Sequence, residues 1–95
     1  MSEEALEYET TATQSEFCRA LHCAFPDGVF GKDALWRVVG EGAAMEITLT
    51  PLPPRVIAAL RLPRVAVRIR FTDGTLEQRQ ILLARLDRAM QRGGG

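Results

Sequence analysis

The side chains with the greatest potential for chemistry are Cys18, His22 and Cys23. Thiolates and imidazoles bind zinc or iron, but such sites take three or four protein ligands, and the chain has only these three soft donors. On a helix Cys18 and His22 would share an edge, whereas Cys23 would lie about 100° away from His22. A catalytic cysteine also needs a base that a third group orients, and the sequence shows no such partner for His22. We therefore expect no metal site, no cofactor and no thiol catalysis.

The C-terminal Gly93-Gly94-Gly95 is the second feature that could take part in chemistry. A terminal diglycine resembles the end of the ubiquitin-like sulfur carriers, in which the last carboxylate is activated. The resemblance covers the tail alone, because a predicted helix precedes it here, whereas those carriers end on a strand. The simpler interpretation is a helix C-cap and a flexible tail, since glycine tolerates positive φ. A carrier or enzyme accessory protein that acts through Gly93–Gly95 or through Cys18 and Cys23 is the alternative function.

Sequence motifs of the common enzyme classes are absent. The chain contains no Gly-x-Gly-x-x-Gly, no phosphate-binding loop that ends in Gly-Lys-Ser/Thr, and no Gly-x-Ser-x-Gly. Asp73-Gly74 is typical of a turn. These observations favour a protein that is not an enzyme.

The stretch from Arg64 to Phe71 has the most regular pattern in the chain. Apolar residues at Val65, Val67, Ile69 and Phe71 alternate with Arg64, Ala66, Arg68 and Arg70. A period of two predicts a β-strand with one buried face and one solvated face. If the other strands follow the same rule, the solvated face carries a set of arginines, which are the candidate binding residues: Arg37, Arg55, Arg61, Arg64, Arg68 and Arg70.

Three interpretations of this arginine-bearing face remain open. It is a plain solvated face of an antiparallel sheet, a protein interface that uses the arginines and apolar residues such as Leu35 and Val39, or a nucleic-acid platform. The last is not expected, because single-strand platforms stack bases on aromatic side chains and none is predicted on this face. We predict a small binding or assembly module that uses this face for a protein partner or for self-association as a homodimer.

Two capping boxes mark the predicted helices. Thr13 and Glu16 begin the first, which buries Phe17, Leu21 and Phe25 and ends at residues 26–28. Thr75 and Gln78 begin the second, which runs to residue 92 with an apolar stripe on one side. The stripe contains Leu76, Leu82, Leu83, Leu86, Ala89 and Met90.

Short strands are predicted between the helices. Residues 29–33 read as a linker with Phe30 tucked beneath it, and residues 35–39 and 44–50 read as two strands joined by the turn at residues 40–42. Pro51, Pro53 and Pro54 are expected to end the second strand. Residues 55–62 fit a further strand or, as the other option, a short helix that starts near Pro54, and Pro63 is expected to separate them from the strand that follows.

The predicted fold is α+β. A small antiparallel sheet of three to four strands, in the order α-β-β-(β)-β-α, carries two helices on one face. Residues 1–12 form a loosely ordered acidic arm, residues 13–92 a single domain, and residues 93–95 a flexible glycine tail. The predicted core lies between sheet and helices and consists of Phe17, Leu21, Phe25, Trp36, Val38, Met45, Ile47, Leu49, Val65, Val67, Ile69, Phe71, Leu82, Leu83 and Leu86.

Charge is balanced overall but segregated along the chain. Residues 1–50 hold nine acidic and three basic residues, whereas residues 51–95 hold nine arginines and three acids. We favour the interpretation that the two halves interleave in space, rather than one in which the arm only shades a basic surface. The longest apolar run, Val56–Leu60, is far shorter than a membrane span, and no signal peptide is recognisable. A cytoplasmic location without a membrane partner is therefore the expectation, with both cysteines reduced.

Overall fold

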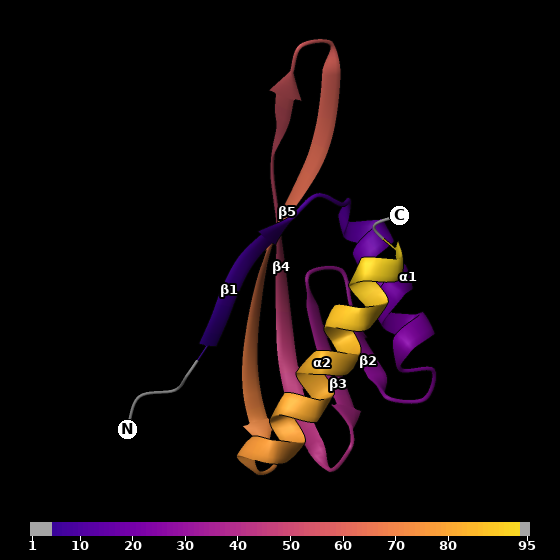
Figure 1. Cartoon of the computed structure of the whole chain (residues 1–95). Helices are drawn as coiled ribbons and strands as arrows, with labels where there is room; N and C mark the ends of the chain where they lie inside the picture. Colours follow the sequence, from indigo (N-terminus) through magenta and orange to yellow (C-terminus); the bar gives the residue numbers. More distant parts are fainter. Residues whose placement is uncertain (1–4, 94–95) are drawn as a thin grey trace.

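The computed structural model of the chain describes residues 5–93, and side chains up to residue 90. It is an α+β structure with a five-stranded antiparallel sheet and two helices (Figure 1). The elements are β1 (Ala5–Thr10), α1 (Gln14–Ala24), β2 (Val29–Lys32), β3 (Leu35–Gly40), β4 (Ala43–Ile57), β5 (Leu60–Asp73) and α2 (Leu76–Gly93).

The strands lie in the order β1-β5-β4-β3-β2, so that β5 and β4 form the centre of the sheet. The register places Trp36 opposite Ile47, and Ile47 opposite Ile69. Because directly opposed residues point to the same side, these apolar side chains share one face, which we call the inner face. The other side of the sheet is the outer face.

Both helices pack against the inner face. Phe17, Leu21 and Phe25 from α1 and Leu82 and Leu86 from α2 are buried in one cluster with the inner-face residues. Every member of the predicted core lies in this cluster, although Phe71 and Leu83 are only partly buried at its margin. Leu76, in contrast, is exposed and does not belong to the apolar stripe of α2.

The two predicted capping boxes are present. The Thr13 hydroxyl accepts a hydrogen bond from the Glu16 amide at 3.0 Å, and the Glu16 carboxylate accepts one from the Thr13 amide at 2.8 Å. Thr75 and Gln78 make the same exchange at the start of α2, at 3.2 and 2.9 Å. Each pair satisfies two amides that the first helical turn leaves without partners.

The structure has more strands than predicted. The prediction of a loosely ordered arm is corrected over Ala5–Thr10, which form β1 and pair with β5 along the edge of the sheet. The predicted linker after the first helix is also corrected, because Val29–Lys32 form β2. Phe30 is exposed and not tucked beneath this segment. Residues 1–4 of the predicted arm, and residues 94 and 95 of the predicted tail, lie outside the described part of the chain.

The prediction that prolines end or separate the central strands was wrong. Leu52 pairs with Arg64 and Arg55 pairs with Leu62, so that Pro53 and Pro54 on β4 oppose Pro63 on β5. Two residues opposite one constitute a β-bulge, where a strand tolerates proline because the ladder needs no amide donor there. The strand interpretation of residues 55–62 is confirmed in place of the helix, but these residues form a hairpin with its turn at Ala58-Ala59.

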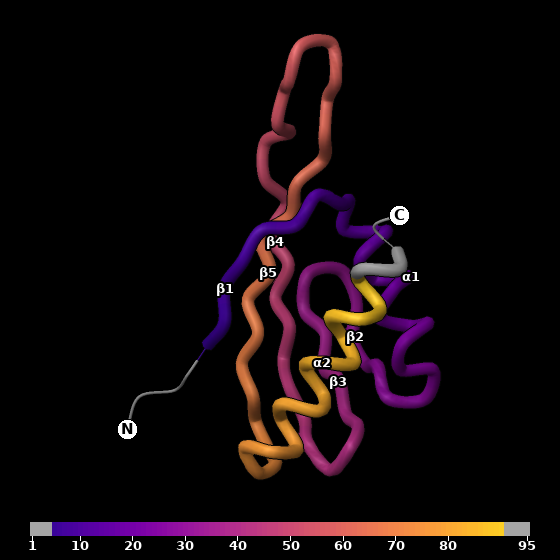
Figure 2. Tube along the Cα trace, viewed as in Figure 1, coloured from indigo at the N-terminus to yellow at the C-terminus, as the bar shows by residue number. Residues whose placement is uncertain are grey.

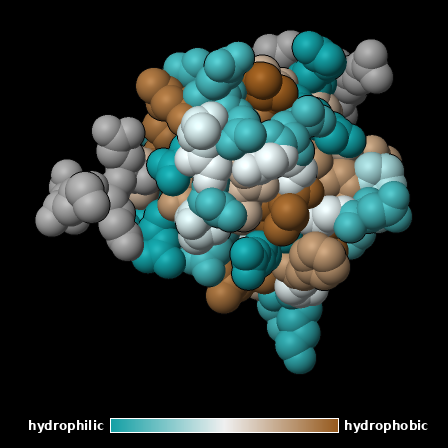
Figure 3. All heavy atoms as spheres, turned by 90° about the horizontal axis from the view of Figure 1, so that it is seen from below, coloured by the Kyte–Doolittle hydropathy of each residue, from teal (hydrophilic) through white to brown (hydrophobic). Residues whose placement is uncertain are grey.

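This hairpin extends beyond the rest of the molecule. Pairing of β3 with β4 stops at Leu35 and Thr48, and pairing of β1 with β5 stops at Thr10 and Val65. Past these positions β4 and β5 continue as a two-stranded ribbon without neighbours, as the chain trace shows (Figure 2). We call residues 53–63 the finger. The opposite end of the molecule, seen from below, is mainly hydrophilic with separate apolar patches (Figure 3).

Candidate functional site

The outer face of the sheet brings together residues from all five strands. One row across the strands consists of Ala5, Arg70, Glu46, Arg37 and Phe30, and the next consists of Glu7, Arg68, Thr48, Leu35 and Lys32. The solvent exposure of Arg37, Thr48 and Arg68 shows that the two helices leave this face uncovered. Alternation along the strands therefore places four of the predicted arginines, Arg37, Arg64, Arg68 and Arg70, on one face.

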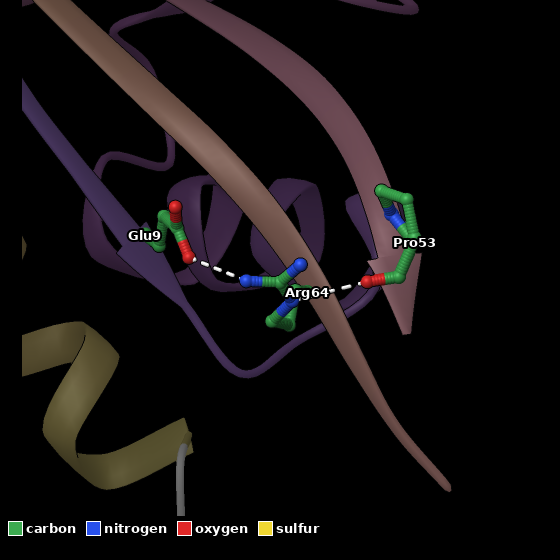
Figure 4. A network of polar contacts seen from close by, with 3 residues as sticks. All are labelled: Glu9, Pro53 and Arg64. Carbon is green, nitrogen blue, oxygen red and sulfur yellow. Dashed lines mark hydrogen bonds and ion pairs between the residues drawn. The ribbon is translucent and has the colours of Figure 1, made fainter. Parts of the chain in front are cut away.

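Arg64 is tied to its neighbours by two contacts at the base of the finger. Its Nη1 lies 2.8 Å from Glu9 Oε1 on β1, and its Nε donates to the carbonyl oxygen of Pro53 on β4 at 3.0 Å (Figure 4). The guanidinium thus joins the end of β1 to the bulged segment of β4. Arg64 therefore holds the finger against the sheet, and this structural role occupies the guanidinium that was predicted to bind a partner.

Arg70 also has an acidic partner on the same face. Its Nη2 lies 2.8 Å from Glu46 Oε1, on the neighbouring strand β4. Both side chains are more than a third exposed, and such pairs contribute about 0–1 kcal/mol because water screens them. The ion pair orders the centre of the face more than it stabilises the fold.

Arg37 and Arg68 remain available for a ligand. Both are exposed, and neither makes a hydrogen bond or ion pair with a described residue. Arg68 lies between Glu7 on β1 and Thr48 on β4, whereas Arg37 lies opposite Phe30 on β2. Glu7 and Glu9 on β1 therefore offset the positive charge on the β5 side of the outer face, whereas the β2–β3 side stays basic and apolar.

Three exposed apolar side chains surround Arg37. Phe30 is its partner across the strands, and Leu35 and Val39 precede and follow it by two residues on β3. Phe30 and Leu35 keep 58% and 56% of their surface exposed. We call Phe30, Leu35, Arg37 and Val39 the β2–β3 patch. The expectation that the outer face lacks an aromatic side chain was wrong, because Phe30 lies on it.

The remaining two predicted arginines lie on the finger. Arg55 pairs with Leu62 and Arg61 pairs with Val56, so the two guanidinium groups project from opposite sides of the ribbon. The predicted common face for all six arginines therefore does not extend over the finger. The reason is the turn at Ala58-Ala59, which lies inside the apolar run and reverses the chain between Arg55 and Arg61.

A hollow of about 460 Å³ lies on the outer face over β1, β5 and β4. Ala66 forms part of its floor, and the longer side chains of Glu7, Glu9, Thr48 and Arg68 surround it. The hollow arises because Ala66 has a much smaller side chain than its cross-strand neighbours Glu9 and Thr50. Its lining offers carboxylate acceptors and hydroxyl groups but no thiol or imidazole for nucleophilic catalysis.

Cys18 and Cys23 are free thiols on α1. Burial raises the pKa of Cys18, a hydrogen bond with Trp36 opposes this effect, and Cys23 is exposed. His22 Nδ1 lies 2.8 Å from the carbonyl oxygen of Cys18, and its ring packs edge-on against Trp36, with the centroids 5.3 Å apart. The imidazole therefore contacts the backbone of Cys18. In residues 5–93 no three histidine, cysteine or acidic side chains are close enough to bind a metal ion.

Comparison with known proteins assigns no family. No protein-family model matches the chain, and no curated protein matches it. Within the described residues neither helix has the length and apolar character that crossing a membrane requires.

Proposed function

We propose that the protein is a non-enzymatic binding module whose working surface is the outer face of its sheet, centred on the β2–β3 patch. The partner is another protein or a second copy of the chain. The observation that carries this proposal is an exposed phenylalanine beside an exposed arginine that has no partner among the described residues, on a sheet face that no described helix covers.

The composition of the patch supports a protein partner. Protein interfaces concentrate their binding energy in a few aromatic and arginine side chains, with apolar neighbours that exclude water around them. Phe30 and Arg37 are the aromatic and arginine residues of the patch, and Leu35 and Val39 are the apolar neighbours that exclude water. Exposed aliphatic and aromatic side chains grouped in this way are otherwise unfavourable on the surface of a monomer.

The rest of the outer face favours a protein over a nucleic acid. Glu7, Glu9 and Glu46 lie among the arginines of β5 and compensate their charge. A polyanion would be repelled by these carboxylates, whereas a protein surface can present complementary charges of both signs. One phenylalanine also cannot stack successive bases along a strand.

A matched pair of variants tests the proposal. Phe30→Ser/Arg37→Glu changes the patch, and Ile81→Ser/Arg88→Glu makes the same kind of change on exposed positions of α2. Self-association is measured by sedimentation velocity, and a partner by quantitative co-purification with the wild-type chain as reference. We expect the patch variant to bind at least about 10-fold more weakly and the α2 variant to bind like wild type.

The opposite result would contradict the proposal. If the patch variant keeps every interaction of the wild type, or if both variants lose them equally, the β2–β3 patch is not the binding surface. Circular dichroism of both variants controls for folding. A salt series adds a further check, because an association centred on apolar contacts persists at salt concentrations that screen exposed ion pairs.

A further inference from the structure

The tip of the finger carries exposed apolar residues on both of its sides, and on one side Arg61 lies beside them. Ile57 pairs with Leu60 on one side of the ribbon, and Val56 lies on the other side opposite Arg61. Val56, Ile57 and Leu60 keep 66%, 50% and 63% of their surface exposed. The two residues of the turn, Ala58 and Ala59, are apolar as well, so five consecutive residues offer no polar side chain to water.

Folding does not account for this composition. None of these five residues belongs to the hydrophobic core, and none of the described strands pairs with the ribbon from outside. Ala58 adopts φ of 53°, a conformation in which glycine or asparagine would be less strained. A hairpin turn that only reverses the chain in water normally uses such polar or glycine residues. The apolar turn therefore indicates contact with something other than water.

The two-sided arrangement indicates what that contact is. A flat protein surface would cover one side of the ribbon and leave the other exposed, whereas a fluid apolar medium surrounds both. The side chains of residues 56–60 also include no aromatic ring and no hydrogen-bonding group, which specific protein recognition uses. Arg55 and Arg61 flank the apolar run in the sequence and project from opposite sides of the ribbon, with Arg61 level with Val56 and Arg55 one residue further from the tip. Because they project from opposite sides, the two arginines can contact anionic groups on both sides of the finger.

We propose that the finger is a lipid-binding device, whose tip enters the headgroup region of a membrane that contains anionic lipids. The run from Arg55 to the turn spans about three residues, or about 10 Å at 3.3 Å per residue. Interfacial segments bury their apolar side chains about 5–10 Å deep. At this depth the free strand edges of the ribbon still reach water and headgroups, so their backbone groups are not stranded in hydrocarbon.

The rest of the molecule suits this orientation. Arg64 bonds to both Glu9 and Pro53 and holds the base of the finger against β1 (Figure 4). The outer face lies along the sheet behind the finger and stays open to a protein partner. The expected lack of a membrane partner concerns segments that span a bilayer, whereas a five-residue tip would reach only the headgroup region. The inference is independent of the proposed protein-binding function.

Vesicle sedimentation tests the inference with the whole chain. The probes are vesicles of phosphatidylcholine alone and of phosphatidylcholine mixed with phosphatidylglycerol. We expect the wild type to sediment with the mixed vesicles. Ile57→Ser/Leu60→Ser should lower its partition at least about 10-fold. Ile81→Ser on α2 is the matched control and should bind like wild type.

A charge variant tests the role of the two arginines. Arg55→Gln/Arg61→Gln should weaken binding to the mixed vesicles and remove most of the preference over phosphatidylcholine, because each basic residue near an anionic surface adds to the attraction. For the wild type, added salt should reduce this preference. Circular dichroism of each variant verifies that the domain stays folded.

Three outcomes would overturn the inference: no sedimentation of the wild type with either vesicle, equal binding of the finger variant and the wild type, or a finger variant that loses a protein interaction and not a lipid one. The last outcome would assign the tip to a protein partner. Phe30→Ser/Arg37→Glu should keep vesicle binding, so that failure of the proposed protein-binding function and failure of this inference give different results.

Discussion

At the scale of single residues, the arginines show why a surface pattern does not identify a binding site. Period-two alternation correctly predicted that Arg64, Arg68 and Arg70 share a face, because alternation depends only on the strand itself. It could not show that Glu9 and Glu46 pair with two of them, since those contacts depend on which strands are neighbours. The sequence therefore could not distinguish Arg37, which is exposed and has no partner in the described part of the chain, from Arg64, which has two.

Tyr8 provides a residue-scale prediction. Burial, with a smaller contribution from the negative charge of Asp87, raises the pKa of Tyr8 to about 12. It is the only tyrosine in the chain, so ultraviolet absorbance of phenolate follows it alone. We expect the folded protein to titrate near this value, and the urea-unfolded chain to titrate near the ordinary value of about 10.

The raised pKa of Tyr8 also has a consequence for stability. Between about pH 10 and about pH 12 the folded state keeps a proton that the unfolded state has lost, so the free energy of unfolding falls as the pH rises through this range. Tyr8→Phe should reduce this fall. At neutral pH it should leave stability within about 0.5 kcal/mol of wild type or raise it, because the buried hydroxyl has no partner among the described residues. An equal pH dependence in both proteins would contradict the assignment.

At the scale of elements, the sequence predicted helices more accurately than strand limits. Both helices begin at capping boxes, which are local signals that need no tertiary information. The prolines of β4 and β5 were misread because proline is compatible with a strand at a bulge, and the bulge exists only once the two strands pair. For the same reason β1 was missed, since its acidic residues become a strand only against the arginines of β5.

The turn of the finger provides an element-scale prediction. Ala58 has φ of 53°, whereas Ala59 does not have a positive φ. Ala58→Gly should therefore stabilise the hairpin by about 0.5–1 kcal/mol, because it relieves left-handed strain, while Ala59→Gly should destabilise it by about the same amount through backbone entropy. Hydrogen exchange of the finger amides measures both effects. The same direction of change in the two variants would contradict this account of the turn.

At the scale of the whole molecule, the segregated charge of the sequence becomes a mixed surface. Glu9, Glu41 and Glu46 from the first half of the chain form ion pairs with Arg64, Arg85 and Arg70 from the second half. The prediction that the two halves interleave is therefore confirmed. Antiparallel pairing causes it, because β1 and β4 flank β5 on its two sides.

The same topology separates three parts of the molecule. The inner face, with its two helices, forms the core, whereas the outer face and the finger stay outside it and carry the two proposed binding surfaces. The sequence predicted the first of these almost completely, because a core needs only the correct period of apolar residues. The β2–β3 patch and the finger depend on a short hairpin and on a turn inside an apolar run, for which the sequence carried weak signals.

The central claim is that the uncovered face of the sheet, around Phe30 and Arg37, is where this protein binds its partner. Hydrogen exchange of the isolated chain and of its complex, with the co-purified partner or with itself at high concentration, tests this claim most directly. We predict increased protection across residues 29–40 and unchanged exchange across residues 80–90 of α2. Protection confined to α1 or α2, or the absence of any complex, would contradict the account.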